Sequence, residues 1–374
     1  MKKSILTIYA MALCLLSCSS GGQDDAFVPE PTPTPDDPTL TGIAFGGDGG
    51  AWHDAPTTRA TTTGLQTLFP SFRVWGYKNN GSTVMDGYQV VYKANSDGST
   101  VTNTAGWEYV GIENANINAQ QIVKYWDYSA TDYRFMAYAP ADAEEVTTTV
   151  TDGEKTIAVP YTYSKDAEAN TTPYVSEMWY TADKTLYGKR VTLTFAPIIA
   201  KVRFKFTYPD DINTIHITDI KFQDSRDDAA IPQNGIITAT YHVTTSPTGS
   251  EPQLGWQEAK NPITGSLVLD TPYEDTNDKV HILTADQYGK WYYVPPMNLI
   301  LYEQGAYTIT ARINGKTSTA SVPAAYMQWK AGYQYTYIFK ITEAGTYITF
   351  MNLQVEQWVN GANVDNSGKG TEGW

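Results

Sequence analysis

Short segments in which apolar and polar residues alternate run through most of the chain. Clear examples are residues 72–77, 201–206 and 307–313. Successive side chains of a strand point to opposite faces, so this pattern predicts strands with one buried face. The remaining expected strands share the pattern: 39–45, 88–92, 133–138, 155–159, 191–195, 215–222, 236–243, 266–269, 291–294, 333–341 and 347–355.

Turn residues separate these segments. Asn79-Asn80-Gly81, Asp152-Gly153 and Asn314-Gly315 each stand between two alternating runs, and such residues favour tight hairpins. No apolar run at helical spacing extends beyond a few turns. The pattern therefore predicts an all-β fold whose strands fall into two groups, which is typical of two β-sandwiches.

The length of the chain agrees with two domains. It has 374 residues, and domains of about 150–200 residues are common. We expect an N-terminal β-sandwich over 39–187 and a C-terminal β-sandwich over 188–345. Residues 346–374 then hold a last strand and a polar, Gly-rich tail.

The first residues indicate export. Lys2 and Lys3 precede a short apolar stretch that is too short to span a membrane. The stretch ends in Leu15-Leu16-Ser17-Cys18, which resembles the bacterial lipobox cut by signal peptidase II. We therefore expect a lipoprotein signal peptide over 1–17, lipidation of Cys18, and a flexible Pro/Ser/Asp-rich linker over 18–38.

Charge and cysteine usage narrow the functional classes. Lys and Arg number 26 against 40 Asp and Glu, a net charge of −14, which argues against binding nucleic acid through its phosphates. The two cysteines, Cys14 and Cys18, both lie in the first twenty residues. The predicted folded body therefore has no disulfide and no cysteine nucleophile.

Motifs for catalysis or metal binding are missing from the sequence. His53, His216, His242 and His281 form no zinc-binding spacing, and no nucleophile elbow, phosphate-binding glycine loop or complete EF-hand is present. We predict a protein that is not an enzyme and that needs no cofactor and no metal.

Several aromatic motifs resemble one family. Residues 107–109, 125–126 and 133–140 look like the N-terminal domain of the fimbrillin-like lipoproteins of Bacteroidetes, the subunits of type V pili. Residues 191–202 resemble the strand pair that opens their second domain, and motifs at 293–296, 329–335 and 355–358 continue the likeness. The resemblance covers the chain after the linker.

This resemblance implies a fold and a function. It implies two tandem Greek-key, transthyretin-like β-sandwiches in a fimbrial structural subunit. Such a subunit reaches the cell outer membrane as a lipid-anchored precursor and ends in an extracellular fimbrium. Its partners would be other pilus subunits, in a homo- or heteropolymer, after a trypsin-like Arg-specific protease has removed the lipid and the first strand.

The expected site of this cut lies between Arg59 and Ala60. Arg59 is the first basic residue after Lys3, and its neighbours Ala, Pro and Thr show no buried-strand pattern. A protease can reach such a segment. The gap left by the first strand would accept a donor strand from a neighbouring subunit.

The candidate donor is the C-terminal segment. Its apolar side chains alternate with polar ones, and a phase slip after Phe350 predicts a bulge or two short strands. An equally open interpretation is that this segment is the last strand of its own sandwich. The candidate donor residues are Ile348, Phe350, Leu353, Val355 and Trp358.

A cell-surface glycan-binding lipoprotein is the alternative function. The chain has 10 Trp and 27 Tyr, and an exposed row of aromatic rings stacks well on sugars. Trp107, Trp126, Trp179 and Trp256 are the candidates for such a platform, although aromatic residues also fill sandwich cores.

Overall fold

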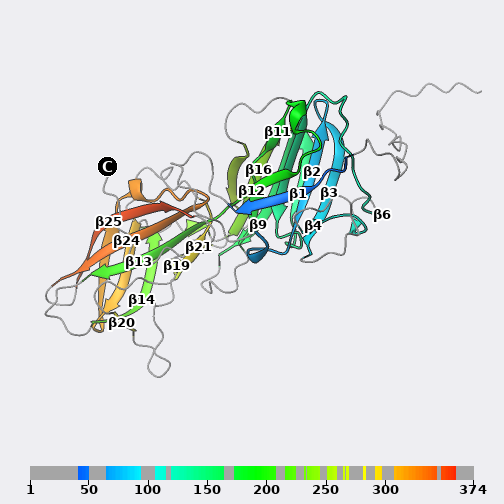
Figure 1. Cartoon of the computed structure of the whole chain (residues 1–374). Coiled ribbons are helices and arrows are strands. Elements are labelled where there is room, and N and C mark those ends of the chain that lie inside the picture. Colours follow the sequence, from blue (N-terminus) through cyan, green and yellow to red (C-terminus); the bar gives the residue numbers. More distant parts are fainter. Residues whose placement is uncertain are drawn as a thin grey trace, which may run out of the picture. The chain divides into compact units, whose positions relative to one another are not determined.

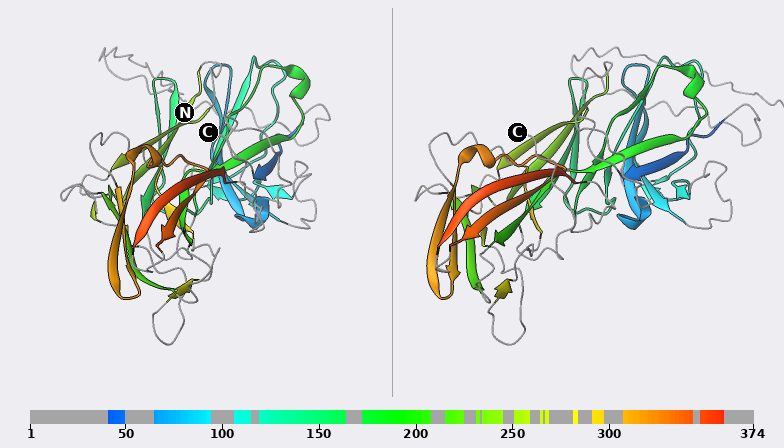
Figure 2. Two further views of the ribbon diagram at one scale, coloured as in Figure 1. Left: turned by 90° about the vertical axis from the view of Figure 1, so that its left-hand side faces the viewer. Right: turned by 60° about the vertical axis from the view of Figure 1, so that its left-hand side comes forward.

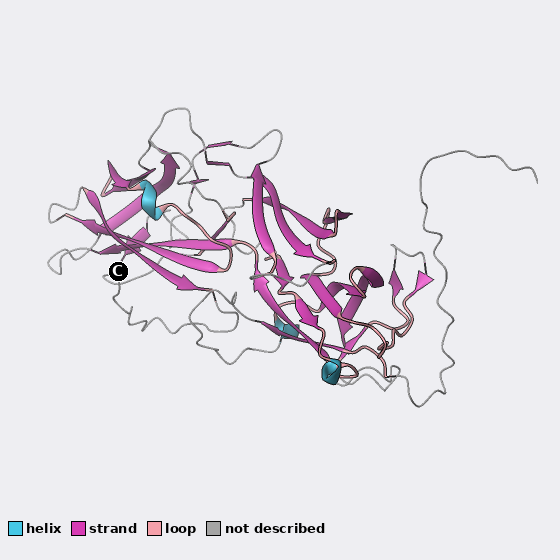
Figure 3. Ribbon diagram, turned by 90° about the horizontal axis from the view of Figure 1, so that it is seen from above, coloured by secondary structure: helices cyan, strands magenta, loops and turns pink. Residues whose placement is uncertain are grey.

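The computed structural model describes residues 41–49, 65–93, 106–114, 119–163, 172–207, 215–224, 231–232, 234–244, 251–258, 264–265, 267–268, 281–283, 291–296, 307–342 and 347–358. All of them lie in one compact unit, Thr41–Trp374. Strands dominate these residues, with short 3-10 turns at Leu65–Thr67 (η1), Lys184–Leu186 (η3) and Ala324–Tyr326 (η5) (Figure 1, Figure 3). The predicted all-β class is confirmed. Within the described part, no helix is long and apolar enough to cross a membrane.

The largest sheet has eight strands in the order β1-β12-β10-β7-β2-β3-β4, with β11 also paired to β7. Its strands are β1 (Phe45–Gly49), β2 (Ser71–Lys78), β3 (Ser82–Tyr92), β4 (Trp107–Glu108), β7 (Tyr133–Ala139), β10 (Tyr174–Ser176), β11 (Trp179–Thr181) and β12 (Val191–Pro197). All seven residues of β7 are buried. The reason is that one hydrophobic cluster lies against each face of the strand.

We call these two clusters the β1-side core and the inter-sheet core. The β1-side core contains Ile43, Phe45, Leu65, Phe69, Phe72, Val74, Met85, Tyr88, Val90, Trp107, Tyr109, Trp126, Ala130, Tyr133, Phe135, Ala137, Ala139, Tyr174, Tyr187, Val191, Leu193 and Phe195. The inter-sheet core contains Trp75, Tyr77, Met136, Tyr138, Ile157, Val159, Tyr161, Val175, Ile198, Ile199, Ile237, Ala239, Tyr241, Val243 and Trp358. Neighbouring residues of β7 therefore point into different cores.

A second sheet covers the inter-sheet core. Its order is β17-β16-β9-β8, built from β8 (Thr147–Thr151), β9 (Glu154–Thr162), β16 (Asn234–His242) and β17 (Gln253–Glu258). β9 and β16 pair antiparallel along their whole length, and buried residues recur at every second position of each. This sheet therefore joins strands that lie far apart in the sequence.

Two further sheets share a third core. One has the order β21-β13-β24-β25, from β13 (Ala200–Thr207), β21 (Tyr292–Val294), β24 (Tyr333–Ile341) and β25 (Ile348–Gln357). The other has the order β19-β14-β22-β23 with β20 beside β14, from β14 (Ile215–Asp224), β19 (Leu267–Val268), β20 (His281–Leu283), β22 (Tyr307–Ile313) and β23 (Lys316–Val322). Phe204, Ile309 and Tyr337 are among the side chains between them. Short pairs complete the fold: β5 (Glu113–Asn114) with β6 (Ala119–Gln120), and β15 (Ile231–Pro232) with β18 (Thr264–Gly265).

The predicted turn chemistry is confirmed at the hairpins. Asp152 and Gly153 both have positive φ, 51° and 79°, between β8 and β9. Asn314 and Gly315, at 49° and 81°, do the same between β22 and β23. Two central residues with positive φ define a type I′ turn, whose twist matches that of the flanking strands.

The start of the first strand differs from the prediction of residues 39–45. The strand begins at Phe45, where the predicted one ends. Before it, Gly42 forms an isolated bridge with Tyr125, and the chain joins β12 only afterwards. The predicted strand was placed too early because the glycines of β1 gave no strand signal.

The predicted domain boundary near residue 187 stays a prediction. β12 follows that residue and pairs with β1 and β10, and β16 pairs with β9. Sheet hydrogen bonds therefore connect strands from both sides of the expected boundary. The predicted signal peptide 1–17 and linker 18–38 lie outside the described residues.

Candidate functional site

The first strand lies at one end of the eight-stranded sheet. β1 runs parallel to β12, with Phe45 opposite Val191 and Gly49 opposite Phe195. The Val191 N–H donates to the Ala44 carbonyl at 2.8 Å. Because only one long neighbour holds β1, fewer sheet hydrogen bonds must break to remove it than to remove a central strand.

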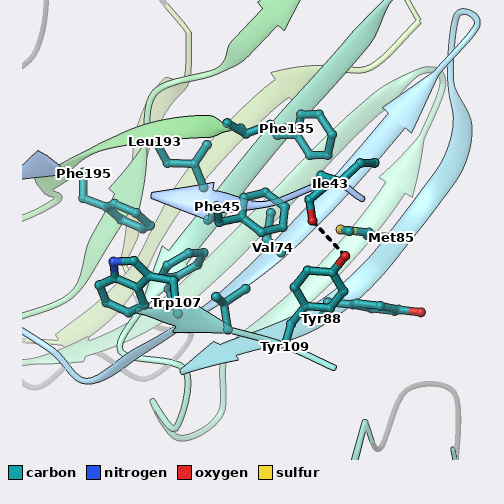
Figure 4. Packing of buried hydrophobic residues seen from close by; sticks show 14 of the residues in the cluster. Ile43, Phe45, Val74, Met85, Tyr88, Trp107, Tyr109, Phe135, Leu193 and Phe195 are labelled. Carbon is teal, nitrogen blue, oxygen red and sulfur yellow. Dashed lines mark hydrogen bonds between the residues drawn. The ribbon is translucent and has the colours of Figure 1, made fainter. Parts of the chain in front are cut away.

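The residues just before β1 are held by another segment. The Ile43 N–H donates to the Lys124 carbonyl at 2.7 Å, and the Trp126 N–H donates to the Thr41 carbonyl at 2.9 Å. The Tyr109 hydroxyl donates to the Ile43 carbonyl at 2.8 Å (Figure 4). Burial raises the pKa of Tyr109 above its usual range, so this hydroxyl keeps its proton and remains a donor.

Two side chains anchor this segment in the β1-side core. Ile43 and Phe45 are 0% and 1% exposed. The Phe45 ring lies 5.7 Å from Phe135 and 6.0 Å from Tyr109, in edge-on geometry (Figure 4). Aromatic rings prefer such edge-to-face contacts. Ile43 and Phe45 thus dock the first strand and the residues before it among aromatic side chains of the β1-side core.

The last strand lies at the end of another sheet. β25 pairs antiparallel with β24, and Figure 2 shows the two strands side by side near the red end of the chain. The pairing passes from Phe350 to Asn352 and skips Met351, so the predicted bulge is present. In this chain β25 is therefore paired within its own fold.

The predicted donor residues differ in burial. Ile348 and Leu353 are 4% and 8% exposed, and Phe350 packs against the same core. Val355 is 38% exposed at the sheet edge. The strand thus carries large apolar side chains and lies at a sheet end, which are the two features that a donated strand needs.

Trp358 fastens the end of this strand. Its N–H donates to the Gly332 carbonyl at 2.7 Å, and its side chain is buried in the inter-sheet core. The Lys201 ammonium lies 4.5 Å from the Trp358 ring centroid, and the Tyr293 ring lies 5.5 Å away. Burial lowers the pKa of Lys201 to about 8. Moving β25 would require these contacts to break.

The remaining predicted site residues, Cys18, Arg59 and Ala60, lie outside the described residues. Arg59 falls in the sequence between β1 and β2. Sequence reasoning missed the roles of Gly47 and Leu65, which meet inside the β1-side core. A glycine at an inward position of a strand is the signal that could have pointed to this close approach.

The tryptophans proposed for glycan binding do not form one exposed row. Trp107 and Trp126 are 4% and 2% exposed. Trp126 stacks on Tyr187, and Trp179 and Trp256 pack partly buried against hydrophobic cores. These rings therefore mainly fill cores.

A metal centre is not formed by the part of the chain that the structure describes, because no group of three or more His, Cys, Asp or Glu side chains gathers there. The features that stand out are instead two terminal strands, each at a sheet end. The described residues thus form a β protein with its first and last strands at the ends of two different sheets.

Comparison with known proteins gives the family. A sequence model of the fimbrillin-like family matches residues 58–358, and the chain belongs to this family. A fimbrial protein from Bacteroides vulgatus is 17% identical, with a TM-score of 0.47 over 85% of this chain and 100% of that one. A fimbrial assembly protein from Parabacteroides distasonis is 10% identical, with a TM-score of 0.37 over 85% and 99%. No curated protein matches the chain.

Family membership confirms the predicted resemblance. It indicates a structural subunit of a cell-surface fimbrium that assembles with other subunits, and a protein that is not an enzyme.

Proposed function

We propose that this fimbrial subunit is exported as a lipoprotein through Cys18, cut after Arg59, and polymerised by donor-strand exchange. The observation that supports this proposal best is the position of β1. It ends the eight-stranded sheet, its Phe45 side chain is buried, and Arg59 follows it in the sequence before β2. A cut at Arg59 would separate β1 covalently from the rest of its sheet.

Loss of β1 would leave an unstable surface. The edge of β12 would lose its hydrogen-bond partners, and the pocket of Ile43 and Phe45 would open to water. Burying a large apolar side chain is worth ~1.5–3 kcal/mol. An unpaired strand edge beside an apolar trough favours binding of another extended strand.

The proposed donor is β25 with the residue that follows it. Ile348, Phe350, Leu353, Val355 and Trp358 supply the side chains for a neighbouring groove. Each subunit would then accept one strand and pass on another. Such head-to-tail contacts generate an open filament and not a closed ring.

Replacement of Arg59 tests the cut. The variant Arg59→Ala should be exported and folded but should not enter filaments, as judged by electron microscopy and by the N-terminal sequence of the surface protein. Thr61→Ala, two residues away, is the matched control and should assemble normally. Normal filaments from Arg59→Ala would contradict the proposed maturation.

Replacement of Cys18 tests the anchor separately. Cys18→Ala should remove the lipid, measured as a loss of mass and of membrane association in the precursor. A Cys18→Ala precursor that still carries acyl chains would contradict the assignment.

A further inference from the structure

One inward position of β1 has no side chain. Ile43, just before β1, and Phe45 both point into the β1-side core, and Gly47 lies on the same face of the strand as Phe45 because strand side chains alternate. Ile43 and Phe45 are buried there, whereas position 47 is glycine. A Cβ atom at Gly47 would lie 2.1 Å from Leu65 Cδ2 and 3.6 Å from the Phe195 ring. The space beside Gly47 is therefore already occupied.

Leu65 fills this space from outside the sheet. Its side chain is 1% exposed and belongs to the β1-side core. It opens the turn η1, and its carbonyl accepts the N–H groups of Leu68 and Phe69 at 3.0 and 3.2 Å. The turn holds the backbone of Leu65 in place. Its side chain therefore limits the size of the residue at position 47, the third inward position after 43 and 45.

We infer that the groove beneath β1 selects the strand that occupies it by size. It accepts large apolar residues at the first two inward positions and glycine at the third. The partner that fits is an extended segment of another subunit with this pattern. As an interpretation of strand exchange, this inference rests on the proposed function.

The chain's own last strand does not match the pattern. Aligning Ile348 and Phe350 with Ile43 and Phe45 places Asn352 at the position of Gly47 if the alternation is regular, or Leu353 if the bulge at Met351 is kept. A side chain there would meet Leu65, because even a single Cβ atom approaches it too closely. The groove therefore favours a strand from a different kind of subunit over a copy of β25. The proposed donor β25 would then enter the groove of a different kind of subunit, and the filament would be a heteropolymer.

A double-mutant cycle on the intact chain tests whether Leu65 sterically excludes a side chain at position 47. Gly47→Ala alone should raise amide exchange in β1 by about tenfold, because overpacking weakens its docking. In the Leu65→Ala background the same change should have little effect. Gly46→Ala is the control, because the atoms nearest to its Cβ belong to the flexible Arg190 side chain, with Nε at 3.0 Å. Additive effects of Gly47→Ala and Leu65→Ala would overturn the inference; Leu65→Val serves if the alanine variant does not fold.

Peptide binding tests the choice of partner. The probes are a peptide of residues 41–49, the same peptide with Gly47→Val, and a peptide of residues 346–358, each added to chain cut after Arg59. We expect the unchanged peptide to bind at least about tenfold more tightly than the other two. Equal or tighter binding of either rival peptide would overturn the inference. The mutant cycle uses the uncut chain, so its result does not depend on cleavage after Arg59. It therefore distinguishes a wrong cleavage site from a wrong assignment of size selection to Leu65.

Discussion

Phe45 is the large apolar residue of β1 that docks the strand on its core. Its ring is 1% exposed and contacts Phe72, Tyr109 and Phe135. The adjoining residues of β1 are glycines, which offer no side chain to the core. The stability of the docked strand therefore depends strongly on this one ring.

Phe45→Ala should lower the free energy of unfolding by about 3–5 kcal/mol, because it removes buried area and leaves a cavity. Urea unfolding followed by tryptophan fluorescence measures the change. Met351→Ala is the control, because Met351 is 55% exposed, and it should change the stability by less than about 0.5 kcal/mol. Equal effects of the two substitutions would show that Phe45 is not anchored as described.

Lys155 is a cation held in a largely apolar place. It is 3% exposed, and its Nζ lies 4.5 Å from the Trp75 ring centroid. Burial lowers the pKa of Lys155 to about 8, while the charge of Asp86 opposes this shift. The folded protein thus binds the Lys155 proton less tightly than the unfolded chain, whose lysines titrate near 10.5.

This pKa gives a pH-dependent prediction. Below pH 8 the folded state must carry a buried charge, and this cost disappears as the pH rises from 8 to 10.5. Lys155→Met should therefore be more stable than the natural chain at pH 7, by at most roughly 3 kcal/mol. The difference in the free energy of unfolding should shrink towards pH 10.5. A difference that grows with pH would contradict the assignment.

The two terminal strands differ as elements. β1 has five residues, of which three are glycine, whereas β25 has ten residues rich in large side chains. Glycine within a strand costs about 0.5–1 kcal/mol relative to alanine. β1 is thus a weak occupant of its groove, so a better-fitting strand could replace it at a gain in free energy.

Removal of residues 346–374 should convert the subunit into a chain terminator. The subunit that lacks residues 346–374 could still accept a strand but would have none to pass on. Added to natural subunits, it should shorten filaments, measured by electron microscopy.

Circular dichroism provides the check on folding, because β25 also covers its own core. If the truncated chain does not fold, Val355→Asp tests the same step, since Val355 is 38% exposed in the free subunit. Unchanged filament length with a folded terminator would rule out β25 as the donor.

The charge of the whole molecule influences its assembly. Residues 60–374 contain 23 basic and 33 acidic residues, a net charge of −10. Subunits with the same sign of charge repel one another, and salt screens that repulsion over about 10 Å at 0.1 M.

Raising NaCl from about 20 mM to about 200 mM should therefore speed assembly of cut subunits with partner subunits that are also acidic. Light scattering measures the rate. Guanidinium chloride must not replace NaCl in this test, because it also unfolds the subunit. A rate that falls with added NaCl would show that attractive charge pairs dominate the encounter.

The sequence predicts local structure better than pairing. The bounds of β22 and β24 agree with the predicted 307–313 and 333–341, because clean alternation extends over each strand. The pairing of β9 with β16 could not be predicted, since it depends on contacts between segments far apart in the chain. The role of Leu65 was hidden for a similar reason, because a single leucine in a turn gives no periodic signal.

The large sheet has a separate core on each face, and the first strand contributes to only one of them. If that strand leaves, the contacts on the opposite face lose nothing. A subunit without a donor strand would then keep the inter-sheet core intact while the β1-side core is open to water. The intact core limits aggregation before the polymer forms.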